Sequence, residues 1–200
     1  MKPIEAFFRE IDARWVARDG ARVRLPIIGS AALLLQTDYE RGTKDGDVLR
    51  TRSLSADVQE QLLALAGQGT RLHTRHRIYL EFVASGLPFL PHVPLWHELT
   101  ALNASLRHLD IMVLDVVDVV VSKLKRYSAH DRSDIAAMIE RELVSHDRLI
   151  SRFVAAVDSY ADGAGGPFIP QYVANLHRVE ADEYGVDPTP IELPSWLDEG

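Results

Sequence analysis

Apolar side chains recur at helical spacing at the start of the chain and through most of its second half. The first stripe consists of Ile4, Phe7, Phe8, Ile11 and Trp15. This period predicts a helix over about residues 3–18, with Gly20 placed to cap it. Similar stripes follow Ser55, Ser128 and Ser145, each a favourable N-cap residue. A last stripe predicts a helix over about residues 169–184.

Shorter apolar runs at 23–28, 47–51, 78–83 and 106–114 predict strands. Pro26 has no N–H group to donate to a ladder, so we expect the first of these strands near an edge of the sheet or at a bulge. The valine-rich run over 115–124 contains β-branched residues, which favour a strand, but its 3.6-residue period predicts a helix.

Strands that alternate with helices, followed by helices alone, indicate an α/β (α+β) domain. We predict a small mixed sheet with a C-terminal helical bundle. Residues 1–115 would form the core sheet and its helices, residues 116–186 a helical region packed on that core, and residues 187–200 a Pro-rich acidic tail.

The composition indicates one soluble globular domain, since 46% of the 200 residues are hydrophobic and 26% are charged. The absence of cysteine excludes a disulfide framework and a thiolate zinc site. Without a signal peptide or a long apolar window, we expect a cytoplasmic protein that does not enter a membrane. The net charge of −7 argues against a surface that attracts nucleic acid broadly.

Gly29 and Ser30 lie at the junction between the first strand and a short apolar helix over 31–35. At such a junction the free backbone N–H groups and the helix dipole favour an anion. Gly29 would allow a phosphate to come close to the backbone. The junction therefore predicts a phosphate-binding site.

Asp45 and Asp47 flank Gly46 at the start of the second predicted strand. Residues i and i+2 of a strand point to the same side, so both carboxylates would converge. Two carboxylates at such a short distance repel each other unless a cation lies between them or one of them is protonated. Magnesium is often held by one or two carboxylates together with substrate phosphates, which indicates nucleotide chemistry.

Gly-Ser, a short helix and then Asp-x-Asp resemble the signature of the polymerase-beta-like nucleotidyltransferase superfamily. The stretches Ile78–Pro91 (IYLEFVASGLPFLP) and Val116–Ile135 (VVDVVVSKLKRYSAHDRSDI) resemble its minimal bacterial branch, which includes the AbiEii-type abortive-infection toxins. The resemblance covers roughly residues 20–145. The chain departs from the usual family pattern at two positions. Gly46 stands where a branched apolar residue is common, and Glu81 stands where aspartate is more common.

Glu81 is an acid inside the apolar strand 78–83, where an unpaired carboxylate is costly to bury. The resemblance implies that Glu81 joins Asp45 and Asp47 as a ligand of Mg²⁺ (or Mn²⁺). The alternative is an edge position from which Glu81 reaches solvent or an arginine. Asp110 is a rival third carboxylate that we rank below Glu81.

Lys123 and Asp131 have a structural and a functional interpretation each. Lys123 is either a snorkelling lysine that covers apolar surface or, as the resemblance implies, a cation that faces the triphosphate. Asp131 fits a capping box with Ser128, and it also matches the family's charged element near the active site. Arg132 and Asp134 belong to the same element and are weaker candidates.

By resemblance, the protein is a metal-dependent nucleotidyltransferase that moves a nucleoside monophosphate from an NTP to an acceptor hydroxyl. Gly29 and Ser30 would hold the β- and γ-phosphates, and Glu81 or Asp47 would accept the proton of the acceptor. The acceptor would be RNA, such as a tRNA, or a protein, and the chain would act as a toxin with an antitoxin protein as partner. The alternatives are a toxin–antitoxin type interaction protein and a degenerate domain that binds nucleotide without turnover.

Residues 71–77 (RLHTRHR) form a strongly basic run in this acidic chain. One interpretation is a solvated loop that leads into the third strand. The other is an electropositive lip for nucleic acid or nucleotide, which would supply the local attraction for RNA that the net charge does not.

Overall fold

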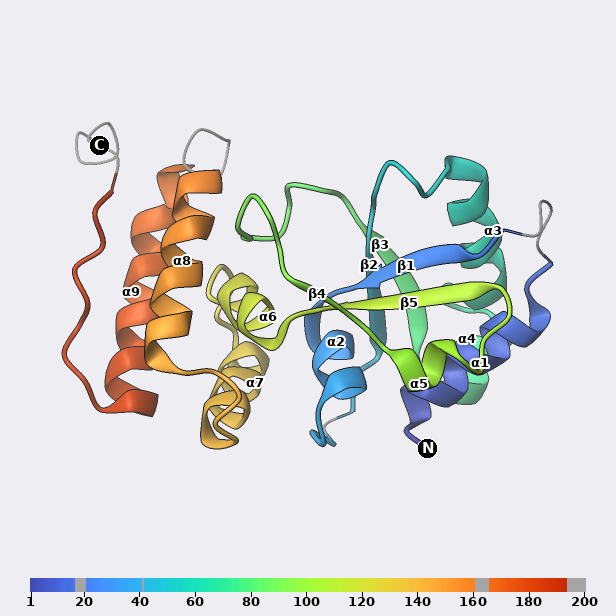
Figure 1. Cartoon of the computed structure of the whole chain (residues 1–200), viewed down its shortest axis with the longest axis horizontal. Coiled ribbons are helices and arrows are strands. Elements are labelled where there is room, and N and C mark those ends of the chain that lie inside the picture. The colour runs from blue at the N-terminus through green and yellow to red at the C-terminus, as the bar shows by residue number, and fades with distance from the viewer. Residues whose placement is uncertain (17–20, 41, 161–165, 194–200) are drawn as a thin grey trace. The chain divides into compact units, whose positions relative to one another are not determined.

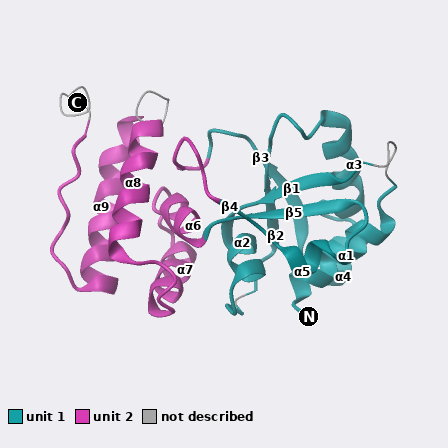
Figure 2. Cartoon of the chain, in the orientation of Figure 1, with its two compact units in different colours: residues 1–87, 96–115 teal, residues 88–95, 116–200 magenta. Residues whose placement is uncertain are grey.

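The computed structural model describes residues 1–16, 21–40, 42–160 and 166–193. The chain divides into two compact units, shown in Figure 2. Unit 1 comprises residues 1–87 and 96–115, and unit 2 comprises residues 88–95 and 116–200. The sequence placed all of 1–115 in the core domain, whereas the structure assigns the segment 88–95 to unit 2.

Unit 1 is a mixed α/β structure (Figure 1). Its helices are α1 (Pro3–Arg14), α2 (Gly29–Gln36), α3 (Ala56–Ala66), α4 (Arg71–His76) and α5 (Thr100–Asn103). Its strands are β1 (Val23–Ile27), β2 (Asp45–Leu49), β3 (Tyr79–Val83), β4 (Trp96–Glu98) and β5 (Leu109–Leu114). The predicted strands are present, while β4 and α5 lie in a part of the chain where the sequence pattern predicted neither.

The five strands form one mixed sheet in the order β3-β2-β1-β5-β4. Strand β1 is parallel to β5 and antiparallel to β2, β2 is parallel to β3, and β4 is antiparallel to β5. This confirms the predicted mixed sheet. It also puts the end of β1 and the start of β2 at the same end of the sheet, because Ile27 pairs with Val48.

Pro26 lies in the third of the five strands, so the predicted edge position is wrong. Val23 N–H donates to His108 on the β5 side, and Ile28 N–H donates to Asp47 on β2. Since successive residues alternate in direction, the nitrogen of Pro26 faces β2. Ile27 and Val48 are the one register pair between β1 and β2. The ladder between these strands has therefore already ended at Pro26, and the missing N–H of Pro26 leaves no ladder bond unmade.

Buried side chains of β1, β5 and α1 form the core of unit 1. The fully buried members are Leu25, Ile27, Leu109, Ile111, Val113, Leu114, Phe7, Phe8 and Ile11. Asp12, also on α1, is 5% exposed and accepts hydrogen bonds from the backbone N–H groups of Arg107, His108 and Leu109. Helix α1 is therefore anchored to the start of β5 by polar as well as apolar contacts.

The ends of two predicted elements differ from the prediction. Helix α1 ends at Arg14, four residues early, with an extended backbone at Trp15. The predicted Gly20 cap lies outside the described residues. Residues 71–76 form helix α4 instead of a loop, because Thr70 caps it through the N–H of His73 and Arg77 ends it in the left-handed conformation.

Unit 2 is helical. It contains α6 (Val116–Lys123), α7 (Ala129–Glu140), α8 (His146–Tyr160), a 3-10 turn (Gly166–Phe168), α9 (Ile169–Val179) and a π-helical turn (Glu180–Tyr184). The valine-rich run is therefore a helix, and the predicted capping box of Ser128 and Asp131 is present. No helix within the described ranges is long and apolar enough to cross a membrane.

Phe89 fixes the segment 88–95 in unit 2. Its fully buried ring contacts the rings of Phe153, Tyr160 and Tyr172, with centroids 5.0–5.5 Å apart. Aromatic edge contacts of this kind stabilise beyond the area they bury. A second anchor is the N–H of Leu95, which donates to Asp118 at 2.7 Å.

The extended segment after the π-helical turn is attached to the first residue of that turn, Glu180. Glu180 is fully buried and accepts hydrogen bonds from His146 and from the backbone and hydroxyl of Thr189. Burial raises the pKa of Glu180, but the bonds from Thr189 and His146 lower the pKa more, so that it ends below its ordinary value. The described part of the predicted tail is thus tied down by a buried carboxylate.

Candidate functional site

Strands β2 and β3 bring the predicted carboxylates to one face of the unit 1 sheet. The two strands are parallel, with Asp45 paired to Tyr79 and Asp47 paired to Glu81. Register partners on adjacent strands point to the same face, as do residues i and i+2 of one strand. Asp45, Asp47 and Glu81 are therefore neighbours on a single face, as the period-two argument predicted for the first two.

This face is accessible, and its opposite is packed. Asp45 and Asp47 are half-buried and Glu81 is exposed. On the opposite face, Val48 is fully buried and Leu80 is 1% exposed. Glu81 therefore reaches solvent, which was the alternative to a metal role, and its position beside Asp47 is compatible with both interpretations.

Gly29 lies against the carboxylate of Asp47. A Cβ atom built on Gly29 would be 2.7 Å from Asp47 Oδ2, and the φ angle of Gly29 is +64°. The N–H of Ile28 donates to the carbonyl of Asp47 at 2.9 Å, which fixes this approach. A side chain at position 29 would fill the space beside the carboxylate, so glycine is required there for both conformation and contact.

Gly46 has a packing explanation. It is buried on the opposite face of β2, where an added Cβ would lie 3.4 Å from both Leu80 Cδ2 and the carbonyl oxygen of Tyr79. Phe7 of α1 lies 3.9 Å from the same point. A branched apolar residue would have to displace these neighbours, so the close packing of α1 and β3 accounts for the departure from the family pattern.

Asp110 is on the same face of the sheet but has other partners. Its register partner on β1 is Arg24, whose Nε donates to Asp110 at 2.9 Å. The side-chain amide of Asn103 donates to the second oxygen at 3.1 Å. Asp110 is therefore paired with a cation and an amide, while Glu81 is the acid placed next to Asp47.

The donors of this face suit a hard cation. Asp45 and Asp47 supply carboxylate oxygens, and Mg²⁺ commonly takes one or two carboxylates and completes its shell with substrate phosphates. Among the residues that the structure describes, no group of three or more His, Asp or Glu side chains is gathered closely enough to hold an ion alone. The carboxylate pair and the glycine backbone beside Asp47 fit a metal that arrives with phosphates.

Lys123 is buried in unit 2, so of its two interpretations the snorkelling position on the surface is wrong. Its side chain is 7% exposed, and its Nζ lies 2.8 Å from Asp134 and 3.2 Å from Asp131. Asp134 is fully buried. A contact between Lys123 and a triphosphate stays a prediction, and it would require Nζ to give up these carboxylates in part.

Asp131 is the centre of a polar cluster in unit 2. It closes the capping box with Ser128 and accepts hydrogen bonds from Arg126 at 2.8 and 2.9 Å. Burial raises the pKa of Asp131, but the bonds from Arg126 and Ser128 and the charge of Lys123 outweigh it and hold that pKa well below its ordinary range. These contacts give Asp131 a full structural role, and its role near a nucleotide remains a prediction.

Some residues of the basic run 71–77 are paired with an acid, and others are exposed to solvent. Glu10 of α1 accepts from Arg75 at 3.1 Å and contacts His76 at 2.6 Å, while Arg71 and Arg77 are exposed. The hydrogen bond with His76 and the charges of the arginines hold the pKa of Glu10 below its ordinary value, against a smaller effect of burial. Part of the positive charge is thus compensated within unit 1.

Tyr79 is a member of the site that the sequence did not single out, and His73, which the sequence indicated only as part of the basic run 71–77, lies against it. Tyr79 is the register partner of Asp45, and the ring of His73 on α4 contacts the Tyr79 ring with centroids 5.1 Å apart. The interaction with Asp45, burial and the surrounding negative charges raise the pKa of Tyr79 to about 12. Tyr79 has the same spacing to Glu81 as Asp45 has to Asp47, a signal that needs the strand register to be interpreted.

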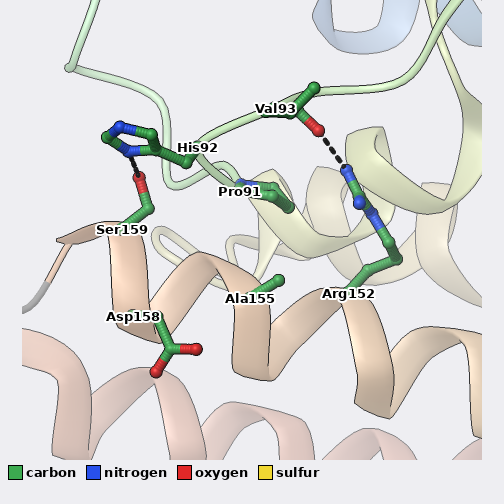
Figure 3. Close-up of a pocket in the computed structure, with 7 residues that line it drawn as sticks. All are labelled: Pro91, His92, Val93, Arg152, Ala155, Asp158 and Ser159. Carbon is green, nitrogen blue, oxygen red and sulfur yellow. Dashed lines mark hydrogen bonds between the residues drawn. The ribbon is translucent and has the colours of Figure 1, made fainter.

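A separate pocket lies in unit 2, between the segment 91–93 and helix α8, with a volume of about 370 Å³ (Figure 3). Nδ1 of His92 lies 3.4 Å from Ser159 Oγ, but Asp158 points away from His92, so no Ser-His-Asp arrangement forms. Arg152 donates to Val93 and binds Asp118 through both Nε and a terminal nitrogen. None of the predicted site residues lines this pocket.

The mixed sheet, with paired acids beside a glycine at the strand–helix junction, is the arrangement of a nucleotidyltransferase domain. A family model described as "Nucleotidyltransferase of unknown function (DUF6036)" matches residues 5–164, and the chain belongs to this family. The match confirms the broader resemblance, whereas the AbiEii-type relationship remains a prediction. No curated protein and no solved structure matches the chain significantly.

Proposed function

We propose that the protein is a metal-dependent nucleotidyltransferase that transfers a nucleoside monophosphate from an NTP to an acceptor hydroxyl. The approach of Gly29 to the carboxylate of Asp47, 2.7 Å from a Cβ position to Oδ2, is the observation that carries this proposal. It places a helix N-terminus that favours phosphate beside a carboxylate pair that favours a cation. Family membership supports the reaction class.

Each residue of this face has a defined role in the proposal. The backbone at Gly29 and Ser30 binds the β- and γ-phosphates. Asp45 and Asp47 hold Mg²⁺ or Mn²⁺, with Glu81 as the third carboxylate. The bound ion supplies charge neutralisation at the phosphates and lowers the pKa of the acceptor hydroxyl.

The reaction is an in-line displacement at the α-phosphorus. The acceptor oxygen forms a bond to the α-phosphorus while the bond to the bridging oxygen of the β-phosphate breaks, and pyrophosphate leaves. The proton of the acceptor hydroxyl passes to the carboxylate of Asp47 or Glu81. Glu81 is suited to this role because it is exposed and therefore within reach of an incoming acceptor.

RNA is the acceptor that the charge distribution favours. Arg71 and Arg77 are exposed. Helix α4 reaches the carboxylate face because its His73 contacts the ring of Tyr79 on β3. A phosphate backbone on α4 would therefore lie near the paired acids despite the net charge of −7. A protein acceptor is an outcome that the labelling experiment below distinguishes, and a toxin role with an antitoxin partner stays a prediction.

A thermal melt with and without ligand tests the proposal. Mg²⁺ or Mn²⁺ with an NTP should raise the melting temperature, since a ligand at a hundredfold excess over its Kd stabilises by about 2.7 kcal/mol. Asp45→Asn with Asp47→Asn should abolish the rise. The control is Asp57→Asn with Asp147→Asn, which removes the same charge from two exposed positions. Equal stabilisation of the parent and the Asp45/Asp47 variant would show that the metal assignment is wrong.

Transfer is measured with NTPs labelled at the α-phosphate, each incubated with the protein, total RNA and lysate. Label in RNA supports a nucleic-acid acceptor, and label in a polypeptide supports a protein acceptor. Binding without label in any macromolecule supports the degenerate domain. A protein that neither binds nor transfers nucleotide is best explained as an interaction protein.

A further inference from the structure

Tyr79 is held beside Asp45 by backbone and side chain together. The two residues are register partners of the parallel β2–β3 pair. The N–H of Tyr79 donates to the carbonyl of Lys44 at 3.0 Å, which fixes the start of β3 against the start of β2. As register partners on one face, the two side chains lie next to each other, and since an ionised carboxylate can only accept, the Tyr79 hydroxyl is the group that would donate between them.

Helix α4 holds the Tyr79 ring in place through His73. His73 meets the Tyr79 ring edge to face, with an interplanar angle of 71°. Nδ1 of His73 accepts from the N–H of Gly69 at 2.9 Å, and the N–H of His73 donates to the N-cap Thr70. The orientation of the tyrosine is therefore set by the cap of a helix, which is a rigid support for a side chain at a sheet end.

We propose that Tyr79 is a positioning residue whose hydroxyl orients the carboxylate of Asp45 for a divalent metal ion. A carboxylate has about four acceptor positions, so one bond from Tyr79 fixes its rotation and leaves the others to the ion. Outer partners of this kind orient metal ligands, and their loss costs about 10–100-fold in metal affinity. The inference rests on the proposed function, because it takes Asp45 as a metal ligand.

The hydroxyl has a limited part in holding the fold. Tyr79 is half-buried, and Tyr79→Phe removes one oxygen atom while the ring keeps its contact with His73. A structural role would therefore appear as a lower melting temperature without metal. A positioning role would appear as weaker metal binding at an almost unchanged melting temperature.

The test is a Mn²⁺ titration of the full chain, followed by the electron paramagnetic resonance signal of free Mn²⁺, with and without a non-hydrolysable NTP. Tyr79→Phe should raise the Kd for Mn²⁺ by about tenfold. The matched control is Tyr184→Phe in unit 2, whose hydroxyl donates to the carbonyl of Val144 at 2.8 Å and which should leave the Kd unchanged. In turnover, the Mn²⁺ concentration for half-maximal rate should rise while kcat at saturating Mn²⁺ stays near that of the parent.

Four outcomes overturn the inference. They are a parental Kd in Tyr79→Phe, an equal loss in Tyr184→Phe, a metal-free melting temperature more than about 5 °C lower in Tyr79→Phe, and a parent chain that takes up no Mn²⁺. The last outcome removes the proposed metal site as well. The first leaves that site intact, provided that Asp45→Asn still weakens Mn²⁺ binding, so the two failures are distinguishable.

Discussion

The backbone of Gly29 approaches the carboxylate of Asp47 so closely that a Cβ atom at position 29 would lie 2.7 Å from Oδ2. The strand–helix junction and the start of β2 therefore form one continuous surface. A side chain at position 29 would occupy the space in which the proposal places phosphate and metal.

Gly29→Ala should remove the stabilisation by metal and NTP and destabilise the metal-free fold. The left-handed backbone of Gly29 alone costs an L-residue about 1–2 kcal/mol, and the contact with Asp47 adds to this. Gly86→Ala is the matched control, because Gly86 has a φ of +85° and nothing within 4 Å of an added Cβ. Urea denaturation should show the larger loss at position 29. Equal losses of unfolding free energy in both variants would mean that the Asp47 side chain moves away from the new methyl group without a measurable energetic penalty.

Glu81→Gln should weaken the stabilisation by Mg²⁺ and NTP at least tenfold in apparent Kd, with little change in the metal-free melting temperature. The reason is that Glu81 is exposed and lies beside Asp47. Asp110→Asn should keep the ligand effect, because Asp110 is paired with Arg24 and Asn103. Isothermal titration of both variants checks this. The reverse result would make Asp110 the third carboxylate.

Lys123→Met should destabilise the protein by about 3–5 kcal/mol, since it leaves Asp131 and Asp134 buried with less compensation. Lys125→Met removes a lysine two residues away, whose Nζ contacts the hydroxyl of Tyr160, and should cost about 1 kcal/mol. Denaturant midpoints at neutral pH measure both. If Lys123→Met folds with parental stability, Lys123 is not a structural cation and its predicted contact with the triphosphate gains weight.

The depressed pKa of Asp131 predicts a loss of stability in acid. A carboxyl whose folded pKa is below its unfolded value of about 3.9 stabilises fully above that value, and the effect fades as pH falls toward the folded pKa. The urea midpoint of the parent should therefore fall from about pH 5 downward. In Asp131→Asn the midpoint should depend less on pH over this range. Parallel curves for both proteins would contradict the assignment.

Replacement of Arg71, Arg75 and Arg77 by glutamine should weaken RNA association and flatten its salt dependence. Each phosphate contact contributes about −0.7 to the log–log slope for single strands, so the slope should fall by up to about two units. The same change at three exposed arginines of unit 2, Arg141, Arg148 and Arg178, is the charge-matched control. Fluorescence anisotropy over a salt series measures both. If the triple variant binds RNA with the affinity and salt dependence of the parent, and transfers label to RNA equally well, α4 is excluded as the RNA-binding surface.

The sequence by itself determined the features that depend on neighbours along the chain. Ser55 and the Ser128–Asp131 box start the helices they were predicted to start, and the valine-rich run forms α6 as its period indicated. Asp45 and Asp47 share a face because two residues along a strand return to the same side. The match to the nucleotidyltransferase family agrees with the motif at Gly29 and Asp47.

Only the tertiary structure decided which strands meet and what surrounds each charge. The pairing of Asp47 with Glu81 and of Asp45 with Tyr79 depends on the register between β2 and β3, which lie about thirty residues apart and have no local pattern that fixes their alignment. Pro26 is tolerated in a central strand because the neighbouring ladder ends beside it. The burial of Lys123 between Asp131 and Asp134 follows from how α6 packs on α7, since a lysine on an apolar helix has the same sequence pattern whether its end reaches water or a carboxylate.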